Sequence, residues 1–483
     1  MAHETLGFHS LTDEIAEELP VSGTVPDWLS GSLVRNGPGA FEFGDVGVEH
    51  WFDGLAMLHK FTFEDGGVTY RNRFLHTEAY ESARNGAVKS GFATGTTTLF
   101  ERIKGFLLDA PYDNVNIIAE RIGRRYLALT ETPRRVEFDP ETLATKNHVQ
   151  YDGPEPAGNF ACAHLNRDPE TGEMVNFEIE FGRTSKYHVH SMPSARERDH
   201  ICSISVSEPA YMHSFALTPN YVVLTEFPFV VNPLDLFRPG KQGPFIDQFE
   251  WKPERGTRFF VIDRASGEVV AEPRTEAFFG FHHVNAYESD SRADSPGEEL
   301  VIDLETVPDT AAIDTLTLDR LRAGELGAFA GQLERFRVTL GDGVEIEREL
   351  LCDGTSLPTV SPAKWCRNHR YVYAQGTDQP VTEWPRELVK IDTETGAVTS
   401  FSDGENRFSE PIFVPKDDWS RKSETGDGRN EDEGVVLSVM LDVSAETSFL
   451  VVVDGKSFTE LAKARVPHAI PFDFHGRFFS ELD

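Results

Sequence analysis

The stretch Val261-Ile262-Asp263-Arg264-Ala265-Ser266-Gly267-Glu268 contains the unit from which the chain is built: an apolar strand, a turn centred on an aspartate, and a second strand. Aspartate and glycine suit such turns, because the carboxylate accepts hydrogen bonds from nearby backbone N–H groups and glycine tolerates positive φ. The unit recurs at 136–142, 168–173, 390–396, 452–457 and, in a shorter form, 63–68. Each copy predicts a β-hairpin, and many hairpins with few helices predict an all-β protein.

The spacing of these hairpins is irregular, which fits a β-propeller whose blades carry loops of unequal length better than a regular solenoid. Short β-branched or aromatic stretches supply further strands, at 221–224, 300–304, 371–374 and 435–439. One helix is expected at 309–323, and a solvated charged loop at 417–434. No linker divides the chain, so we expect one domain spanning 1–483, although length alone would suggest about three.

The composition excludes several classes of function. The chain has 80 acidic and 46 basic residues and a formal net charge of -34, which argues against a nucleic-acid partner and against tight docking on anionic lipid. Since 39% of the residues are hydrophobic, the chain is not a disordered polyanion. Such acidity indicates a halophilic protein, in which salt screens the self-repulsion.

The N-terminus lacks the apolar segment of a secretory signal, and no stretch is apolar enough to span a membrane. The four cysteines form no Cys-x-x-Cys pair, so we expect them to be reduced in a soluble, cytoplasmic protein.

Four histidines stand in short apolar stretches far apart in the sequence: His164, His213, His282 and His475. A lone histidine in such a setting is more often a hydrogen-bonded core residue than a ligand. In a propeller, however, the innermost strand of each blade faces a central channel, so four inner strands could each contribute one imidazole. Neutral imidazole suits iron, zinc, copper or nickel, and spacing alone does not choose among them.

Two neighbouring details limit this hypothesis. If strand alternation holds, the adjacent His282 and His283 point to opposite faces, so one of them faces the axis, and the sequence does not select which. His188, His190 and His200 lie among charged and polar residues and are expected at the surface.

The chain resembles the carotenoid cleavage oxygenases, a family that includes the retinoid isomerase of the retinal pigment epithelium. The resemblance runs almost from end to end and is closest to the animal β-carotene oxygenase branch. Besides the histidine stretches, it is carried by Val34-Arg35-Asn36-Gly37-Pro38, His50-Trp51-Phe52-Asp53-Gly54, Met57-Leu58-His59, the segment 209–221, Glu410-Pro411-Ile412-Phe413-Val414 and Phe474-His475-Gly476.

This resemblance implies a seven-bladed β-propeller, with loops and a few short helices covering an Fe(II) ion held on the axis by His164, His213, His282 and His475. It selects His282 over His283. It also implies carboxylates that orient the ligands, with Glu131 and Glu410 at two of these positions. The third falls at Ser356, where the family usually has glutamate, and we expect the free nitrogen of His282 to face this hydroxyl. Val115 matches a small side chain that limits access to the metal.

The function implied is oxidative cleavage of a carotenoid or apocarotenoid double bond by O2, giving aldehydes such as retinal. The 36 phenylalanines, 11 tyrosines and 6 tryptophans provide enough aromatic surface to line a tunnel for a polyene. The alternatives are a retinoid isomerohydrolase, a stilbene-type dioxygenase, or a catalytically silent propeller that binds a polyene or a partner protein.

An apolar stretch broken by prolines runs through Phe227, Phe229, Val230 and Val231 and continues with Leu234, Leu236 and Phe237. It predicts a hydrophobic rim around a tunnel mouth, with shallow and reversible peripheral membrane contact. A buried strand with a covered loop is the alternative interpretation of the same residues.

Overall fold

The Asp-centred units fold as hairpins in a computed structural model, which describes residues 3–88, 91–94, 112–153, 156–235, 243–290, 298–325, 331–341, 343–379, 381, 383–416 and 431–482. At Asp263, Oδ1 accepts hydrogen bonds from the Ser266 N–H (2.7 Å) and the Ser266 hydroxyl (2.8 Å). The carbonyl oxygen of Asp263 accepts from Gly267 N–H at 2.9 Å. Gly267 has a φ of 72°, which glycine adopts readily.

The same turn recurs at Asp139, Asp168, Asp392 and Asp454, and at Asp442, which the sequence analysis did not single out. In each copy the side chain of the aspartate accepts from the backbone two and three residues later. Local chemistry therefore sets these hairpins, and the turn tolerates residues other than glycine at the positive φ, as Leu143 and Phe458 show.

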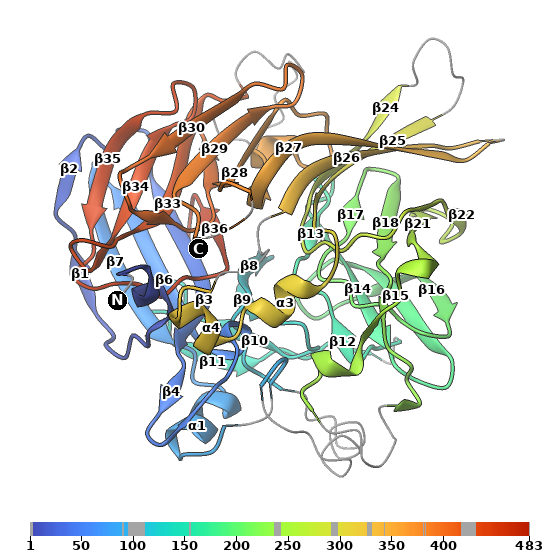
Figure 1. Ribbon diagram of the computed structural model, residues 1–483, viewed down its shortest axis with the longest axis horizontal. Coiled ribbons are helices and arrows are strands. Elements are labelled where there is room, and N and C mark those ends of the chain that lie inside the picture. The colour runs from blue at the N-terminus through green and yellow to red at the C-terminus, as the bar shows by residue number, and fades with distance from the viewer. Residues whose placement is uncertain are drawn as a thin grey trace.

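The hairpins assemble into sheets arranged around a common centre (Figure 1). The first sheet has the order β1 (Ala16–Glu18), β7 (Gly67–Phe74), β6 (Leu55–Glu64), β3 (Gly31–Ala40), β36 (His475–Phe479). The second has the order β11 (Thr145–His148), β10 (Arg135–Phe138), β9 (Arg125–Leu129), β8 (Ile118–Ile122). The third has β12 (Phe160–Ala161) and β13 (Asn166–Arg167) beside β14 (Met174–Glu180), followed by β15 (Ser185–Met192) and β16 (Asp199–Val206).

The fourth sheet contains β17 (Ala216–Leu217), β18 (Tyr221–Glu226) and β21 (Thr257–Asp263), with β22 (Val269–Ala271) and β23 (Arg274–Thr275) at the outer edge. The next sheet has seven strands, in the order β24 (His283–Asp290), β25 (Glu298–Thr306), β26 (Gly331–Thr339), β27 (Glu345–Thr359), β28 (Tyr371–Gly376), β29 (Glu387–Asp392), β30 (Val398–Ser402). The last contains β31 (Arg407–Phe408) and β32 (Ile412–Pro415) beside β33 (Gly434–Asp442), then β34 (Thr447–Asp454), β35 (Glu460–Arg465) and β2 (Val21–Gly23). Two short ribbons pair β4 (Glu42–Phe43) with β5 (Val46–Gly47) and β19 (Phe229–Val230) with β20 (Glu250–Trp251).

The long strand β27 explains why one sheet has seven strands. Its residues from Glu345 to Thr355 pair with β26, and those from Thr355 to Thr359 pair with β28, with a shift of register between Ser356 and Thr359. The change coincides with Leu357, whose φ is 49°. If β27 is counted as the outer strand of one blade and the inner strand of the next, the described sheets fit the seven blades expected for this all-β propeller.

Both chain ends contribute strands to sheets formed by the opposite end. β36 pairs with β3, and β2 pairs with β35. The blue and red ribbons accordingly lie side by side in Figure 1. These two pairings close the ring of sheets.

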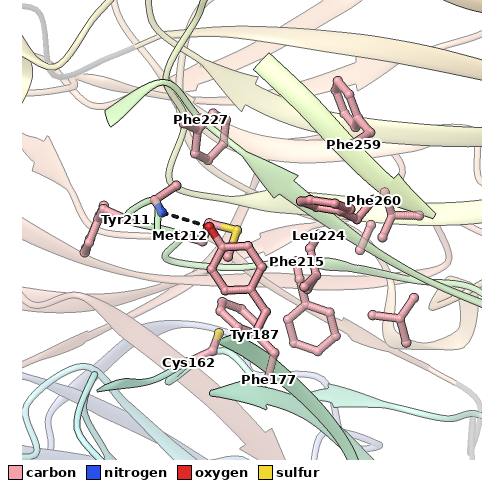
Figure 2. Packing of buried hydrophobic residues seen from close by; sticks show 14 of the residues in the cluster. Cys162, Phe177, Tyr187, Tyr211, Met212, Phe215, Leu224, Phe227, Phe259 and Phe260 are labelled. Carbon is pink, nitrogen blue, oxygen red and sulfur yellow. Dashed lines mark hydrogen bonds between the residues drawn. The ribbon is translucent and has the colours of Figure 1, made fainter. Parts of the chain in front are cut away.

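Hydrophobic side chains fill the space between neighbouring sheets. Figure 2 shows one such layer, where Phe177 and Tyr187 of the third sheet meet Leu224 and Phe260 of the fourth. The buried Tyr187 hydroxyl accepts from the backbone N–H of Ala210 at 2.8 Å and donates to Glu226 at 2.9 Å, so its polar group is satisfied.

The helix expected at 309–323 is two short helices, α3 (Ala311–Thr315) and α4 (Leu318–Arg322). Thr317 has extended backbone angles (φ -73°, ψ 141°) and forms a β-bridge with His50, which interrupts the helix. The other helices of the described residues are α1 (Glu78–Arg84) and the 3-10 turns η1 (His3–Phe8), η2 (Trp51–Asp53), η4 (Ile246–Gln248), η5 (Pro253–Arg255) and η6 (Pro362–Lys364). None of the described helices has both the length and the apolar character needed to cross a bilayer.

Most of the loop expected at 417–434 lies outside the described residues. In its described end, Glu433 is exposed as predicted but Glu431 is not. Glu431 is buried and accepts hydrogen bonds from the backbone N–H groups of Arg370 (2.9 Å) and Tyr371 (2.8 Å). Those two bonds place this carboxylate at the start of β28.

Candidate metal centre

The four histidines singled out in the sequence meet at the centre of the ring. His164 lies between β12 and β13, His213 precedes β17, His282 precedes β24, and His475 begins β36. One nitrogen from each lies within 4.8 Å of the others, and Nε2 of His164 is 3.0 Å from Nε2 of His213. The group could therefore hold one metal ion.

Three of these imidazoles are fixed by carboxylates. Nδ1 of His213 is 2.5 Å from Glu131, Nδ1 of His282 is 2.7 Å from Glu305, and Nδ1 of His475 is 2.9 Å from Glu410. Because a carboxylate only accepts hydrogen bonds, each Nδ1 carries the proton and each Nε2 presents its lone pair. Three lone pairs thus converge on one point.

The expectation for Ser356 is wrong. Glu305 occupies the position beside His282, whereas Ser356 lies on β27, paired with Gln375 of β28. Glu305 is next to the end of β25 and its N–H donates to the carbonyl oxygen of His282 at 2.9 Å. Pairing the apolar stretch 300–304 with the strand after His282 would have indicated this glutamate.

The carboxylates are themselves held by hydrogen bonds. The Tyr211 hydroxyl donates to Glu131 (2.8 Å), and the Gly476 N–H donates to Glu410 (2.8 Å). The fully buried guanidinium of Arg35 contacts Glu410 at 3.4 Å and binds Asp473 through two nitrogens, at 2.5 and 2.7 Å. Burial raises the pKa of Glu410, and the charge of Arg35 opposes this shift.

His283 points away from the centre, as strand alternation predicts for one member of the pair. Nδ1 of His283 is 2.8 Å from the Ser214 hydroxyl, and Nε2 is 2.8 Å from the Thr225 hydroxyl. Burial lowers the pKa of His283 to about 3, and His282 adds to the shift. His283 is thus a neutral, hydrogen-bonded core residue.

The residues present fit a transition-metal ion. Nε2 of His282 is buried and has no hydrogen-bond partner among the described residues, which is costly unless a cation binds it. Burial lowers the pKa of His164 well below its usual value, and the neighbouring histidines and Arg477 add to this shift. Burial also lowers the pKa of His475 well below its usual value, and His282 and His213 add to that shift. Both are therefore neutral, as a metal ligand must be.

Aromatic side chains adjoin one side of the histidine cluster. The ring of Phe281 is 5.5 Å from that of His213 and 6.2 Å from that of Phe52, which in turn is 5.7 Å from Phe474 and 6.0 Å from Phe92. Phe52, Phe92 and Phe281 are partly exposed. They form an apolar wall that a flat, conjugated molecule could contact.

A cavity of about 150 Å³ adjoins the cluster and is lined by His164, His282 and His475 together with other residues, including Ser214, Thr359 and Arg477. Val115 is fully buried, and its carbonyl oxygen accepts from Asn36, which pairs with His475. Its backbone therefore lies beside the strand of one candidate ligand.

Two surface expectations are wrong. His188 and His190 are each 1% exposed, because β15 has a neighbouring strand on both sides, whereas His200 is exposed as predicted. Phe227, Phe229, Val230 and Val231 are also buried, in the same hydrophobic cluster as side chains of the third and fourth sheets. In the predicted rim, Leu234 is 60% exposed, and Leu236 and Phe237 lie outside the described residues.

Comparison with known proteins agrees with this architecture. The family model described as "Retinal pigment epithelial membrane protein" matches residues 8–480. The β,β-carotene 15,15'-dioxygenase of Gallus gallus is 31% identical, over 96% of this chain and 95% of its own. Carotenoid cleavage dioxygenase 8 of Arabidopsis thaliana is 30% identical, over 95% of this chain and 83% of its own.

Among solved structures, a Glu150Gln mutant of the Synechocystis apocarotenoid oxygenase superposes with a TM-score of 0.83 at 25% identity, covering 99% of this chain and 98% of that one. A cobalt-substituted form of the same oxygenase superposes with a TM-score of 0.82. The match of the family model over nearly the whole chain shows that this protein belongs to the retinal pigment epithelial membrane protein family of carotenoid oxygenases.

Proposed function

We propose that this protein is an Fe(II)-dependent dioxygenase that cleaves a double bond of a carotenoid or apocarotenoid with O2 and releases two aldehyde or ketone products. The observation that carries the proposal is the cluster of four converging histidines, three of them oriented by glutamates, beside an aromatic wall. The names of the relatives, β,β-carotene 15,15'-dioxygenase and apocarotenoid oxygenase, support the same reaction.

His164, His213, His282 and His475 would hold the iron, which when bound supplies the one-electron chemistry that O2 requires. Glu131, Glu305 and Glu410 keep three ligands in one tautomer and orientation, so their lone pairs point at a common site before the metal binds. Because the ligands are neutral, the site keeps the full charge of the ion.

The aromatic wall has the second role in this proposal. Phe52, Phe92 and Phe281 offer ring faces and edges beside His213, where a polyene gains apolar contact without needing a hydrogen bond. A substrate aligned along these rings would have one double bond next to the metal. A substrate seated against these rings would displace water from them, which would protect reactive species from hydrolysis.

The proposal includes shallow, reversible contact with a membrane, since the substrate dissolves in lipid. Among the described residues of the segment concerned, Leu234 is the exposed apolar one. Vesicle flotation of the wild type and of Leu234→Asp, in molar salt, tests this part separately from the chemistry.

The central experiment is incubation of the iron-loaded protein with β-carotene and with apocarotenals at high salt, under ¹⁸O2, with the products identified by mass spectrometry. We expect labelled aldehydes in equal amounts from the two halves of the substrate and none from His475→Ala. Retinyl esters and a stilbene tested in parallel address the two alternative reactions. An iron-loaded protein that consumes no O2 with any polyene would contradict the proposal.

A further inference from the structure

The aromatic wall is built from segments that are separate in the sequence. Phe52 lies in the turn η2, whereas Phe92 lies in the short segment 91–94, which is part of no helix or strand. The ring centroid of Phe92 is 6.0 Å from that of Phe52 and 5.5 Å from that of Tyr211. Since no strand pairing fixes the segment 91–94, other contacts must hold the ring of Phe92 in the wall.

The carboxyl group of Asp53, the last residue of η2, supplies two of these contacts. Its Oδ1 accepts a hydrogen bond from the Phe92 N–H at 2.7 Å, and its Oδ2 accepts from the Ala93 N–H at 2.9 Å. Asp53 is 1% exposed, so both bonds lie in the interior. Because Asp53 directly follows Phe52, one turn carries the first ring and holds the backbone of the second.

Gly91 allows the segment to lie this close to Asp53. A Cβ atom at Gly91 would be 2.1 Å from Oδ1 and 2.6 Å from Cγ of Asp53, much closer than real Cβ atoms approach other atoms. The three atoms nearest to that Cβ position all belong to the carboxyl group of Asp53. The lack of a side chain at this position is therefore matched to this one contact.

Further hydrogen bonds attach the same segment to its surroundings. The hydroxyl oxygen of Thr94 accepts from the backbone N–H groups of Glu49 (3.0 Å) and His50 (3.3 Å). The carbonyl oxygen of Phe92 accepts from the Ile246 N–H at 3.0 Å. The backbone of Phe92 is thus bonded on both its N–H and its C=O sides.

The turn that carries Asp53 is itself fixed. Nδ1 of His50 accepts from the Phe52 N–H at 3.1 Å, and Nε2 of His50 donates to the carbonyl oxygen of Ile313 at 2.9 Å. The side-chain amide of Asn116 donates to the carbonyl oxygen of Phe52 at 2.8 Å. Asp53 therefore connects the segment 91–94 to a part of the backbone whose own hydrogen bonds are satisfied.

We propose that Asp53 is a positioning residue for the polyene, which holds the ring of Phe92 at a fixed distance from Phe52. A conjugated chain is a flat apolar strip, and it contacts both rings at once only when their separation is fixed. Asp53 is buried and acts through Phe92, without touching the substrate. This inference rests on the proposed function, because it concerns the wall that the polyene contacts.

The test is an anaerobic titration of the iron-loaded protein with a thirty-carbon apocarotenal, followed by quenching of tryptophan fluorescence. Phe92→Ala should raise the Kd about 3 to 10-fold, the contribution of one aromatic contact. Asp53→Asn should raise the Kd by up to the same factor, since its amide retains one accepting oxygen instead of two. The double variant Asp53→Asn/Phe92→Ala should bind as Phe92→Ala alone does, because no ring remains for residue 53 to hold.

Gly91→Ala disturbs the same contact from the other side and should raise the Kd by up to the same factor. Gly343→Ala is the matched control, because a Cβ atom at Gly343 meets nothing within 4 Å. It should bind the apocarotenal as the wild type does. A melting curve and the iron content of each variant show that the fold and the metal centre are retained. If Asp53→Asn does not fold, Gly91→Ala is compared with and without Phe92→Ala in its place.

Two outcomes overturn the inference alone. One is a wild type that binds the apocarotenal together with folded Asp53→Asn and Gly91→Ala variants that bind it equally well. The other is an Asp53→Asn effect that persists undiminished in the Phe92→Ala background, which would indicate a general structural role. A folded, iron-loaded wild type that binds no apocarotenal overturns the proposed function, and this inference with it.

Discussion

Glu305 is bonded to His282 twice: its carboxylate lies 2.7 Å from Nδ1 of the imidazole, and its backbone N–H donates to the carbonyl oxygen of His282 at 2.9 Å. The second bond belongs to the junction between β24 and β25, so the position of the carboxylate is set by strand pairing. His282 is consequently oriented by a glutamate, as His213 and His475 are.

Glu305→Gln should weaken metal retention about 10 to 100-fold, because the amide forms a weaker hydrogen bond and no longer fixes the tautomer. Iron release to a chelator, followed by absorbance, measures the effect. Ser356→Ala is the control and should release iron at the wild-type rate, since Ser356 lies on β27 away from His282. Faster iron release from Ser356→Ala would show that Ser356, and not Glu305 alone, orients His282.

His282→Ala should abolish metal binding, because it removes one of four ligands. His283→Ala should keep the metal but lower the free energy of unfolding by about 1–3 kcal/mol, since it removes the buried imidazole to which the Ser214 and Thr225 hydroxyls are bonded. Metal analysis and urea unfolding separate the two effects. Loss of metal from a folded His283 variant would show that the roles are reversed.

Arg35→Met should destabilise the protein by about 3–5 kcal/mol, because it leaves the buried carboxylates of Asp473 and Glu410 without the positive charge of the guanidinium. Arg35→Lys should restore part of the loss, as a point charge without the two-nitrogen contact to Asp473. Urea unfolding monitored by tryptophan fluorescence gives both values. Equal stability of the Met and Lys variants would mean that the positive charge of Arg35 does not contribute to the free energy of unfolding.

The stability of the protein should fall as the pH drops from about 6.5 toward 3, in part because of His59. This histidine is buried and bonded to Tyr70, and burial lowers its pKa to about 3. The unfolded chain takes up a proton at about pH 6.5 and the folded chain does not, so protonation favours unfolding throughout this interval. His59→Gln should flatten the curve of unfolding free energy against pH there; an unchanged slope would exclude this residue as a cause.

The melting temperature should rise between dilute and molar salt, because a net charge of -34 repels itself when it is not screened. Scanning calorimetry in KCl from 0.1 to 3 M measures the shift. The same melting temperature at both salt concentrations would contradict the halophilic interpretation.

The sequence predicts the hairpins well because their turns are local: Asp263 and its counterparts satisfy the backbone within a few residues. It does not predict that β27 serves two sets of neighbours, since that depends on the turn at Leu357 and on pairing with strands on both sides. The expected helix at 309–323 failed for a related reason, because the bridge between His50 and Thr317 is a long-range contact.

The site divides in the same way. The four histidines were found from their apolar surroundings and from the family resemblance, whereas Glu305 was missed because its role depends on which strand lies opposite His282. His188 and His190 were misjudged because their neighbours in sequence are polar, but the strands on either side of β15 bury them. Turns can be predicted from residues close in sequence, whereas the burial of a strand residue depends on strands that are distant in sequence.

The pairing of β36 with β3 has a consequence for assembly. His475 comes after all the other candidate ligands in the chain and is the first residue of the strand that closes the ring. A chain still emerging from the ribosome can thus present three of the imidazoles but cannot complete the set until the ring has closed. The metal would therefore bind after the ring has closed. Detachment of β36 from its sheet would in turn remove one ligand, His475, from the metal site.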